Sequence, residues 1–475
     1  MYDICIIGAG VVGCAIAREL SKYDLNICML DKSDDVSNGA SKANSGIVHG
    51  GYAAKYGTLK GKLNFEGNIL YEKLNSELNF GYRKTGGLVL GFSEDDLEAL
   101  KKLYENGIKN GVKSGDMEIL SSKEIIQLEP NINKEVKYAL YAKDVGVTSP
   151  YEFTIALAEN SIENGVELFL ENEVISISKQ VESFVTITQE NKYESKYVIN
   201  AAGVYSDKIA NMMGINNFYI EPKRGQYILL QKEQGYLANT VLFQIPTKIG
   251  KGILVTQTYH GNLMLGPNAE EVDERDNLST TKETLDYIID TARKSVPNFD
   301  VSKILTTFSG MRPISSTGDF VIEESSVTGF INVGGIDSPG LTSSPAIALK
   351  VVGILLTRGL ILKEKKNFNP YRKSILIKKD SGFKGIIDSL DPSTNIICRC
   401  EKITEIEIIN ALNRGIKIKS IDGIKRRTRA GMGYCQGKFC GPRVRSLIAK
   451  ELNISEEEVT KRGPKSSIIL NRVLP

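Results

Sequence analysis

Hydrophobic residues near the start of the chain form two short runs, at residues 4–7 and 25–30, with a helical stretch at residues 11–20 between them. Short apolar runs without a period are typical of parallel strands that are buried on both faces. Gly8, Gly10 and Gly13 mark the passage from the first run into the helical stretch. The start of the chain therefore predicts a strand, a glycine turn, a helix and a second strand.

Beyond this unit the pattern changes twice. Helices alternate with strands up to about residue 200, which predicts a doubly wound α/β core. Between residues 218 and 265 strands follow one another directly, which predicts an antiparallel sheet that covers a site on the core. We expect helices at residues 59–78, 93–110, 150–165, 281–295, 404–414 and 442–452, and strands at residues 86–90, 166–178, 184–188, 197–200, 226–230, 241–245, 252–256, 262–265, 306–313 and 329–335.

The length of 475 residues suggests two or three domains. We expect a main domain at residues 1–370, in which segments of about 80–150 and 218–310 cover the site. A linker at residues 371–395, mixed in charge and containing Gly and Pro, then leads to a small domain at residues 396–475.

Net charge and the most apolar segment narrow the class of protein. The 60 basic and 57 acidic residues give a net charge of +3, so the charge of the whole chain does not point to nucleic acid or a membrane surface. Nucleic-acid binding through the run KRRTR at residues 425–429 stays an alternative. The apolar run at residues 345–362 contains Lys350 and Arg358, each costing roughly 2.5 to 3.5 kcal/mol at a bilayer centre, and we expect a buried helix with no membrane span. The chain begins directly with its first strand, and we expect a cytoplasmic protein, with membrane association through a partner as the alternative.

The glycine turn is suited to a dinucleotide. Gly8 permits the tight turn, Gly10 lets a pyrophosphate approach the backbone, and Gly13 allows close packing of helix on strand. The N–H groups and the positive end of the helix dipole then face the phosphates. Asp31 follows the second strand at the spacing of an acid that accepts hydrogen bonds from a ribose.

Further along, the segments NSGIVHGG, VINAAGVYSD and GGIDSPGL appear in that order. With the glycine turn they resemble the D-amino-acid-oxidase superfamily of FAD enzymes over residues 1–370, and within it the glycerol-3-phosphate dehydrogenase and oxidase branch. The resemblance implies a Rossmann-like FAD-binding domain with an inserted antiparallel-sheet substrate domain. The FAD contacts that it implies are Gly8, Ala9, Gly10, Gly13, Asp31, Ser41, Lys42, Ser45, Gly46, Ile47, Val174, Ala202, Gly203, Gly335, Gly340, Leu341 and Thr342.

His49 is the candidate catalytic residue. It lies in the segment beside the flavin, and the chain contains only one other histidine, His260, which we expect in a hairpin turn. Oxidation of a secondary alcohol needs a base for the hydroxyl proton, and imidazole suits that role. The resemblance implies the same role, while a loop histidine satisfied by hydrogen bonds and a covalent flavin linker remain alternatives.

Three residues are candidates for substrate binding. Arg312, in SGMRPIS, matches an arginine that binds the anionic end of the substrate in the family, and its planar fork suits phosphate and carboxylate alike. Lys251 adds a second cation, with Lys248 nearly as well placed, and Ser338 is expected to hydrogen-bond the substrate beside the flavin.

Four cysteines, Cys398, Cys400, Cys435 and Cys440, cluster near the end of the chain. Thiolates on two loops suit a metal or a cluster, and zinc sites more often use a C-x2-C spacing. The pattern resembles the small α-helical [2Fe–2S] domain of bacterioferritin-associated ferredoxin, also fused to the large subunit of anaerobic glycerol-3-phosphate dehydrogenase; zinc is the alternative. Residues 396–475 hold 17 basic and 8 acidic residues. Three interpretations of this positive excess stay open: it offsets an anionic cluster, it docks an acidic partner, or it forms an ordinary solvated face.

These features predict a FAD-dependent dehydrogenase of a small anionic hydroxy compound. The resemblance implies sn-glycerol 3-phosphate as substrate, with L-2-hydroxyglutarate as the alternative, and electrons that leave through the cluster to a second flavoprotein or another electron-accepting subunit. A non-catalytic flavin and cluster carrier or redox sensor is the alternative from another class. The combination of His49, Arg312 and Ser338 argues against it, because a carrier needs no substrate site.

Overall fold

The computed structural model describes residues 1–245, 252–379, 382–464 and 466–468. A doubly wound core holds the glycine turn. Its parallel strands lie in the order β9, β2, β1, β12, β20, with Ile4 beside Ile27 on one side of β1 and Tyr197 on the other. The strands are β1 (Tyr2–Ile7), β2 (Ile27–Leu30), β9 (Glu167–Phe169), β12 (Lys192–Asn200) and β20 (Phe330–Gly334), with antiparallel β10 (Val174–Lys179), β11 (Phe184–Thr188) and β19 (Val321–Glu324) at the margins.

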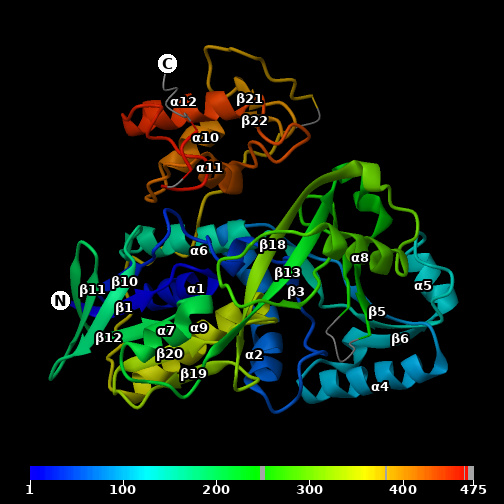
Figure 1. Cartoon of the computed structure of the whole chain (residues 1–475), viewed down its shortest axis with the longest axis horizontal. Helices are drawn as coiled ribbons and strands as arrows, with labels where there is room; N and C mark the ends of the chain where they lie inside the picture. Colours follow the sequence, from blue (N-terminus) through cyan, green and yellow to red (C-terminus); the bar gives the residue numbers. More distant parts are fainter. Residues whose placement is uncertain (246–251, 380–381, 465, 469–475) are drawn as a thin grey trace.

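Helices pack on this sheet and on one another (Figure 1). Helix α1 (Val11–Leu20) contacts α6 (Pro150–Glu163) and α9 (Gly340–Thr357), and α9 also contacts α2 (Leu59–Asn68). Helix α7 (Ser206–Asn211) packs against β12 and β20. Helix α9 is long and apolar enough to cross a membrane, but 61% of its residues are buried inside the fold. This burial agrees with the expectation of a buried helix.

The expected helix at residues 59–78 is broken into α2 and α3 (Tyr71–Leu78). A Cβ at Gly67 would lie 2.1 Å from the Thr342 carbonyl oxygen, so the end of α2 approaches the backbone of α9 closely. The buried helix also begins earlier than expected, at Gly340 rather than near Pro345. Both differences arise where α2 and α9 meet.

A second, nine-stranded sheet covers the core. Strands from the two covering segments join it in the order β17, β13, β16, β15, β14, β5, β7, β6, and β18 pairs with β13 over nearly its whole length. The pairing of β5 with β14 is parallel, and the other pairings are antiparallel. The strands are β5 (Gly87–Gly91), β6 (Met117–Ser121), β7 (Tyr138–Ala142), β13 (Ile220–Leu230), β14 (Val241–Gln244), β15 (Val255–Gln257), β16 (Leu263–Leu265), β17 (Glu270–Glu271) and β18 (Ile304–Ser315).

Three helices border this sheet: α4 (Glu94–Lys109), α5 (Ser122–Leu128) and α8 (Lys282–Arg293). Ser93 and Asp96 form a capping box at the start of α4, as expected where a serine precedes an acidic first turn. A small sheet of β3 (Ile47–Val48), β8 (Gly146–Thr148) and β4 (Tyr82–Lys84) carries the segment with His49 back toward the core.

The C-terminal region is a small helical unit that lies over α6 at the top of Figure 1. It contains β21 (Ile396–Cys398), β22 (Ile403–Thr404), α10 (Glu405–Leu412), α11 (Ile421–Thr428) and α12 (Gly441–Leu452). Helix α11 is absent from the expected elements. The largest apolar core is continuous from Ile16 in α1 to Ile424 in α11 and Ile448 in α12, so this unit packs directly on the core. Within the expected linker, Arg372 is buried and paired with Glu159 of α6 at 2.6 Å.

Candidate functional site

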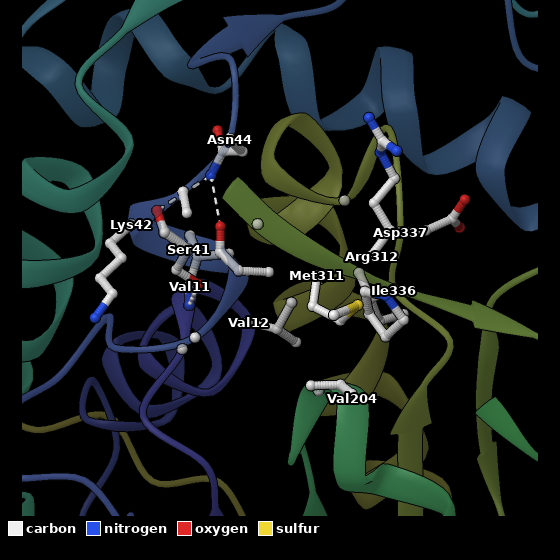
Figure 2. A pocket seen from close by; sticks show the side chains of 18 of the residues that line it. Val11, Val12, Ser41, Lys42, Asn44, Val204, Met311, Arg312, Ile336 and Asp337 are labelled. Carbon is white, nitrogen blue, oxygen red and sulfur yellow. Dashed lines mark hydrogen bonds between the residues drawn. The ribbon is translucent and has the colours of Figure 1, made fainter. Parts of the chain in front are cut away.

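A cavity of about 1140 Å³ lies between the core and the covering sheet. The glycine turn and the loop of residues 38–49 form one wall, and strands β13 and β18 form the other, as the positions of Ser41, Lys42, Met311 and Arg312 show in Figure 2. The cavity brings together most of the predicted site residues. These are Gly8, Gly10, Asp31, Ser41, Lys42, Ser45, Ile47, His49, Val174, Ala202, Gly203, Arg312, Ser338, Gly340 and Leu341.

The glycine turn leaves no room for side chains. A Cβ at Gly8 would lie 2.4 Å from the Ala201 carbonyl oxygen, and one at Gly13 would lie 1.9 Å from the Gly8 oxygen. Asp31 accepts a hydrogen bond from the Ala9 amide at 2.7 Å, and burial raises the pKa of Asp31. The backbone at the start of α1 therefore forms a cradle that carries no side chains, with the Asp31 carboxylate beside it. This arrangement fits the dinucleotide half of FAD.

The loop of residues 38–49 is held against the cradle by polar contacts. Ser41 accepts a hydrogen bond from the Val11 amide at 2.8 Å. Asn44 donates to the carbonyl groups of Ala40 and Ser41, as the dashed lines of Figure 2 show. On the opposite wall, a Cβ at Gly310 would lie 1.9 Å from the Ala43 oxygen, so β18 approaches the loop backbone directly.

His49 projects from this loop toward the segment before α9. Its Nε2 lies 3.5 Å from Ser338 Oγ, and its backbone amide donates to Thr342 Oγ1 at 2.9 Å. The ring packs against Phe243 of β14 with 5.9 Å between ring centroids. The imidazole therefore sits where core, covering sheet and helix α9 meet, with its backbone fixed by α9. His260, by contrast, lies in the turn between β15 and β16 and contacts Glu152 at 2.7 Å.

Arg312 lies on β18, across from Lys223 on β13. Its Nη2 donates to the Asn268 carbonyl oxygen at 3.0 Å, and a Cβ at Gly225 would lie 2.7 Å from the same nitrogen. Burial raises the pKa of Tyr227, and the nearby Arg312 guanidinium opposes that rise. Gly225 thus leaves the space in which the guanidinium lies along the wall of the cavity.

Sequence reasoning missed several residues of this wall. Lys223, Tyr227 and Asn268 all line the cavity, and Lys223 pairs with Glu271 at 2.8 Å. The available signal was the two-residue period of β13, which places residues 223, 225 and 227 on one face. It identifies a shared face but not its direction, because that depends on the pairing with β18.

Five predicted cofactor residues do not line the cavity: Ala9, Gly13, Gly46, Gly335 and Thr342. They lie behind its wall. Gly46 has a φ of +66° and Gly335 a φ of +65°, and a Cβ at either would meet a neighbour within 2.5 Å. These residues shape the loops that reach the cavity. Lys251 and its rival Lys248 lie outside the described residues.

The four cysteines form two pairs. The Cys440 thiol hydrogen-bonds Cys398, which lowers the pKa of Cys398 to about 6 and raises that of Cys440. Burial raises the pKa of Cys400, while hydrogen bonds from the Phe439 and Gly437 backbone and from the Cys400 thiol lower the pKa of Cys435. Over the described part of the chain no three His, Cys, Asp or Glu side chains are arranged to hold one metal ion. Four thiols in two adjoining pairs are a ligand set that a two-iron cluster can use, with one pair for each iron.

Comparisons with known proteins agree with both parts of this site. A glycerol 3-phosphate dehydrogenase of Caloramator mitchellensis is 48% identical over 483 residues, covering 99% of this chain and 98% of that protein. A glycerol 3-phosphate oxidase of Mycoplasma genitalium is 34% identical and covers 78% of this chain and 97% of its own length. The solved structure of dithionite-reduced L-alpha-glycerophosphate oxidase from Mycoplasma pneumoniae with FAD bound matches with a TM-score of 0.75 at 33% identity, covering 78% of this chain and 98% of that one.

Two family models match the chain. The model of the BFD-like [2Fe–2S] binding domain matches residues 396–450, which include the four cysteines. The model described as FAD dependent oxidoreductase matches residues 3–353. The cofactors are therefore FAD and a [2Fe–2S] cluster, and the chain belongs to the family of FAD dependent oxidoreductases.

Proposed function

We propose that this enzyme is a dehydrogenase that oxidises sn-glycerol 3-phosphate to dihydroxyacetone phosphate and passes the electrons through its cluster to an acceptor protein. The observation that carries the proposal is the similarity to a glycerol 3-phosphate dehydrogenase over 99% of the chain, which includes the cysteine region. The oxidase relatives match only 77% to 78% of the chain. A cluster has no use in an enzyme that gives electrons directly to oxygen, so the proposal favours a dehydrogenase.

The geometry of the cavity supports this reaction. His49 Nε2 takes the proton from the C2 hydroxyl group, and Ser338 Oγ, 3.5 Å from that nitrogen, orients the same hydroxyl. Arg312 binds the phosphate, since a guanidinium matches two phosphate oxygens, and Lys223 across the strand pair adds a second positive charge. When bound, FAD supplies the two-electron acceptor for the hydride on C2.

We further propose that Lys251 contributes to phosphate binding and that Cys398, Cys400, Cys435 and Cys440 ligate the cluster. The domain division into residues 1–370, 371–395 and 396–475 belongs to the same proposal. The partner is a second flavoprotein or another electron-accepting subunit. Relatives that are L-2-hydroxyglutarate dehydrogenases are 28% to 32% identical and match 56% to 73% of the chain, less than the glycerol 3-phosphate dehydrogenase does, which supports glycerol 3-phosphate as the first substrate to test.

An anaerobic absorbance titration of protein purified without oxygen tests the proposal. We expect sn-glycerol 3-phosphate to bleach the flavin and then the cluster bands, and L-2-hydroxyglutarate to leave both unchanged. Bleaching by L-2-hydroxyglutarate alone would move the assignment to that substrate. Flavin that no hydroxy acid or amine reduces would instead support an electron carrier. Iron and acid-labile sulfide analysis of the same sample separates a cluster from zinc.

A further inference from the structure

The two cysteine pairs differ in their access to solvent. Cys398 and Cys440 are 1% and 3% exposed and belong to the apolar core shared with the FAD-binding part of the chain. Cys400 is exposed and Cys435 is half-buried. A cluster held by these four thiols would have one iron toward the interior of the protein and the other toward its surface.

The interior side of the cysteine loops faces the FAD-binding core. Arg429 Nη1 lies 3.3 Å from the Tyr151 hydroxyl group at the start of α6, and that hydroxyl is 3.5 Å from Met432 Sδ. Glu401, next to Cys400, accepts from Arg429 at 2.9 Å and from Lys232 at 2.8 Å. These contacts hold the cysteine loops against the core, while Cys400 itself stays exposed.

Two exposed aromatic residues lie next to cysteines in the second cysteine loop. Tyr434 immediately precedes Cys435 and is 65% exposed, and Phe439 immediately precedes Cys440 and is 76% exposed. The Cys400 Sγ would lie only 3.2 Å from a Cβ at Gly433, which places both cysteine loops in direct contact. Large exposed aromatic residues on a soluble domain mark interaction sites and often contribute most to binding.

Three cations lie in the same cysteine loops. Arg399 and Lys402 flank Cys400, and Lys438 precedes Phe439; all three are exposed. Within the described residues none of the three forms an ion pair, whereas Arg426, Arg427 and Arg429 of the same domain are each paired with a carboxylate. The cations beside the cluster are therefore available to carboxylates of another molecule.

We propose that Arg399, Cys400, Lys402, Tyr434, Lys438 and Phe439 form the docking face for an acidic, one-electron redox protein, which takes electrons from the exposed edge of the cluster. The proposal rests on the proposed function, because it needs a cluster that passes electrons outward. The substrate gives up two electrons and two protons, one proton from the hydroxyl group and one within the C2 hydride. Both protons pass to solvent, and each electron reduces one acceptor molecule. Two acceptor molecules are therefore reduced for each substrate molecule that is oxidised.

Native and succinylated cytochrome c are suitable probes, since they share a fold and a one-electron haem but differ in the sign of their charge. The holoenzyme is reduced with stoichiometric dithionite and mixed with either probe in a stopped-flow instrument. We expect succinylated cytochrome c to be reduced about tenfold faster at low ionic strength, because complementary charges steer the encounter. The difference should shrink to about twofold near 0.5 M salt, where charges are screened.

Lys438→Glu should remove the preference for the acidic probe, and Phe439→Ala should slow the reduction of both probes. Lys192→Glu, at an exposed site on β12, is the matched control and should keep the wild-type preference. Equal rates for the two probes, or the same loss in Lys192→Glu as in Lys438→Glu, would overturn the docking face. Since dithionite replaces the substrate, a charge preference without flavin bleaching by glycerol 3-phosphate would refute the proposed function alone.

Discussion

The Asp35 carboxylate and the Arg427 guanidinium form a buried, two-point ion pair, with distances of 2.8 and 2.7 Å, although 392 positions separate them in sequence. Arg426 adds a third contact to Asp35 at 2.6 Å. Asp35 lies between Asp31 and the loop of residues 38–49. Arg427 lies in the last turn of α11, just before the second cysteine loop. The Arg427 and Arg426 charges lower the pKa of Asp35 to about 2, against the effect of burial, so the pair stays charged at any ordinary pH. One loop thus joins the site of FAD to the domain of the cluster.

Asp35→Asn should uncouple the two cofactors. It removes the carboxylate that Arg426 and Arg427 share and leaves Arg427 only its 3.8 Å contact with Glu159, at a cost of about 3 to 5 kcal/mol. We expect substrate to bleach the flavin within about twofold of the wild-type rate, while the cluster bands bleach at least about tenfold more slowly. Stopped-flow absorbance resolves both events. Asp24→Asn, which removes an exposed ion pair with Lys363, is the control. Equal cluster kinetics in both variants would contradict the idea that Asp35 holds the cluster domain in place on the FAD-binding core.

His49→Ala should lower kcat for glycerol 3-phosphate by about 10²-fold or more, because no other group at this position takes the hydroxyl proton. His260→Ala is a matched control, since the chain has only these two histidines and His260 contacts Glu152 away from the loop. Steady-state rates with an artificial electron acceptor measure both variants. A His49→Ala enzyme within about threefold of wild type would exclude the proton transfer proposed for this residue.

Arg312→Met should raise KM for glycerol 3-phosphate by about 10- to 100-fold, the range expected when a hydrogen bond to a charged group is lost. Arg312→Lys should recover only part of the loss, because an ammonium group lacks the planar fork. Arg293→Met, on the exposed face of α8, controls for the loss of one positive charge. An unchanged KM in Arg312→Met would place the phosphate elsewhere in the cavity.

Local signals made the core of the fold predictable. The glycine turn, the first strands and the capped helices depend on neighbours in sequence, and they are found close to where the pattern places them. Helix α11 was missed because its sequence, IDGIKRRT, resembles a solvated loop. Its arginines are buried by Asp35 and Glu159, which lie more than 250 residues away. Lys223 and Tyr227 were missed for a similar reason, since only the register between β13 and β18 turns them toward the cavity.

Lys42 gives a prediction about pH. Burial, with Arg426 nearby, lowers the pKa of Lys42 to about 8 in the folded, cofactor-free chain. The charged amine therefore lowers the free energy of unfolding at pH 7 by an amount on the order of 3 kcal/mol. This destabilisation decreases as the pH rises from about 8 toward the ordinary lysine pKa. Lys42→Met removes the charge while keeping an unbranched chain of similar length.

We expect the Lys42→Met apoprotein to be more stable to urea than wild type at pH 7, and this difference to fall to about half or less at pH 9.5, which is still below the ordinary lysine pKa. Far-ultraviolet circular dichroism at both pH values measures the urea midpoints. Lys55→Met, at an exposed position, should show the same midpoint difference from wild type at pH 7 and 9.5. The urea midpoints of wild type and Lys42→Met could instead differ as much at pH 9.5 as at pH 7. The amine would then be charged at both pH values, and its contact with Asn38 rather than its burial would govern its pKa.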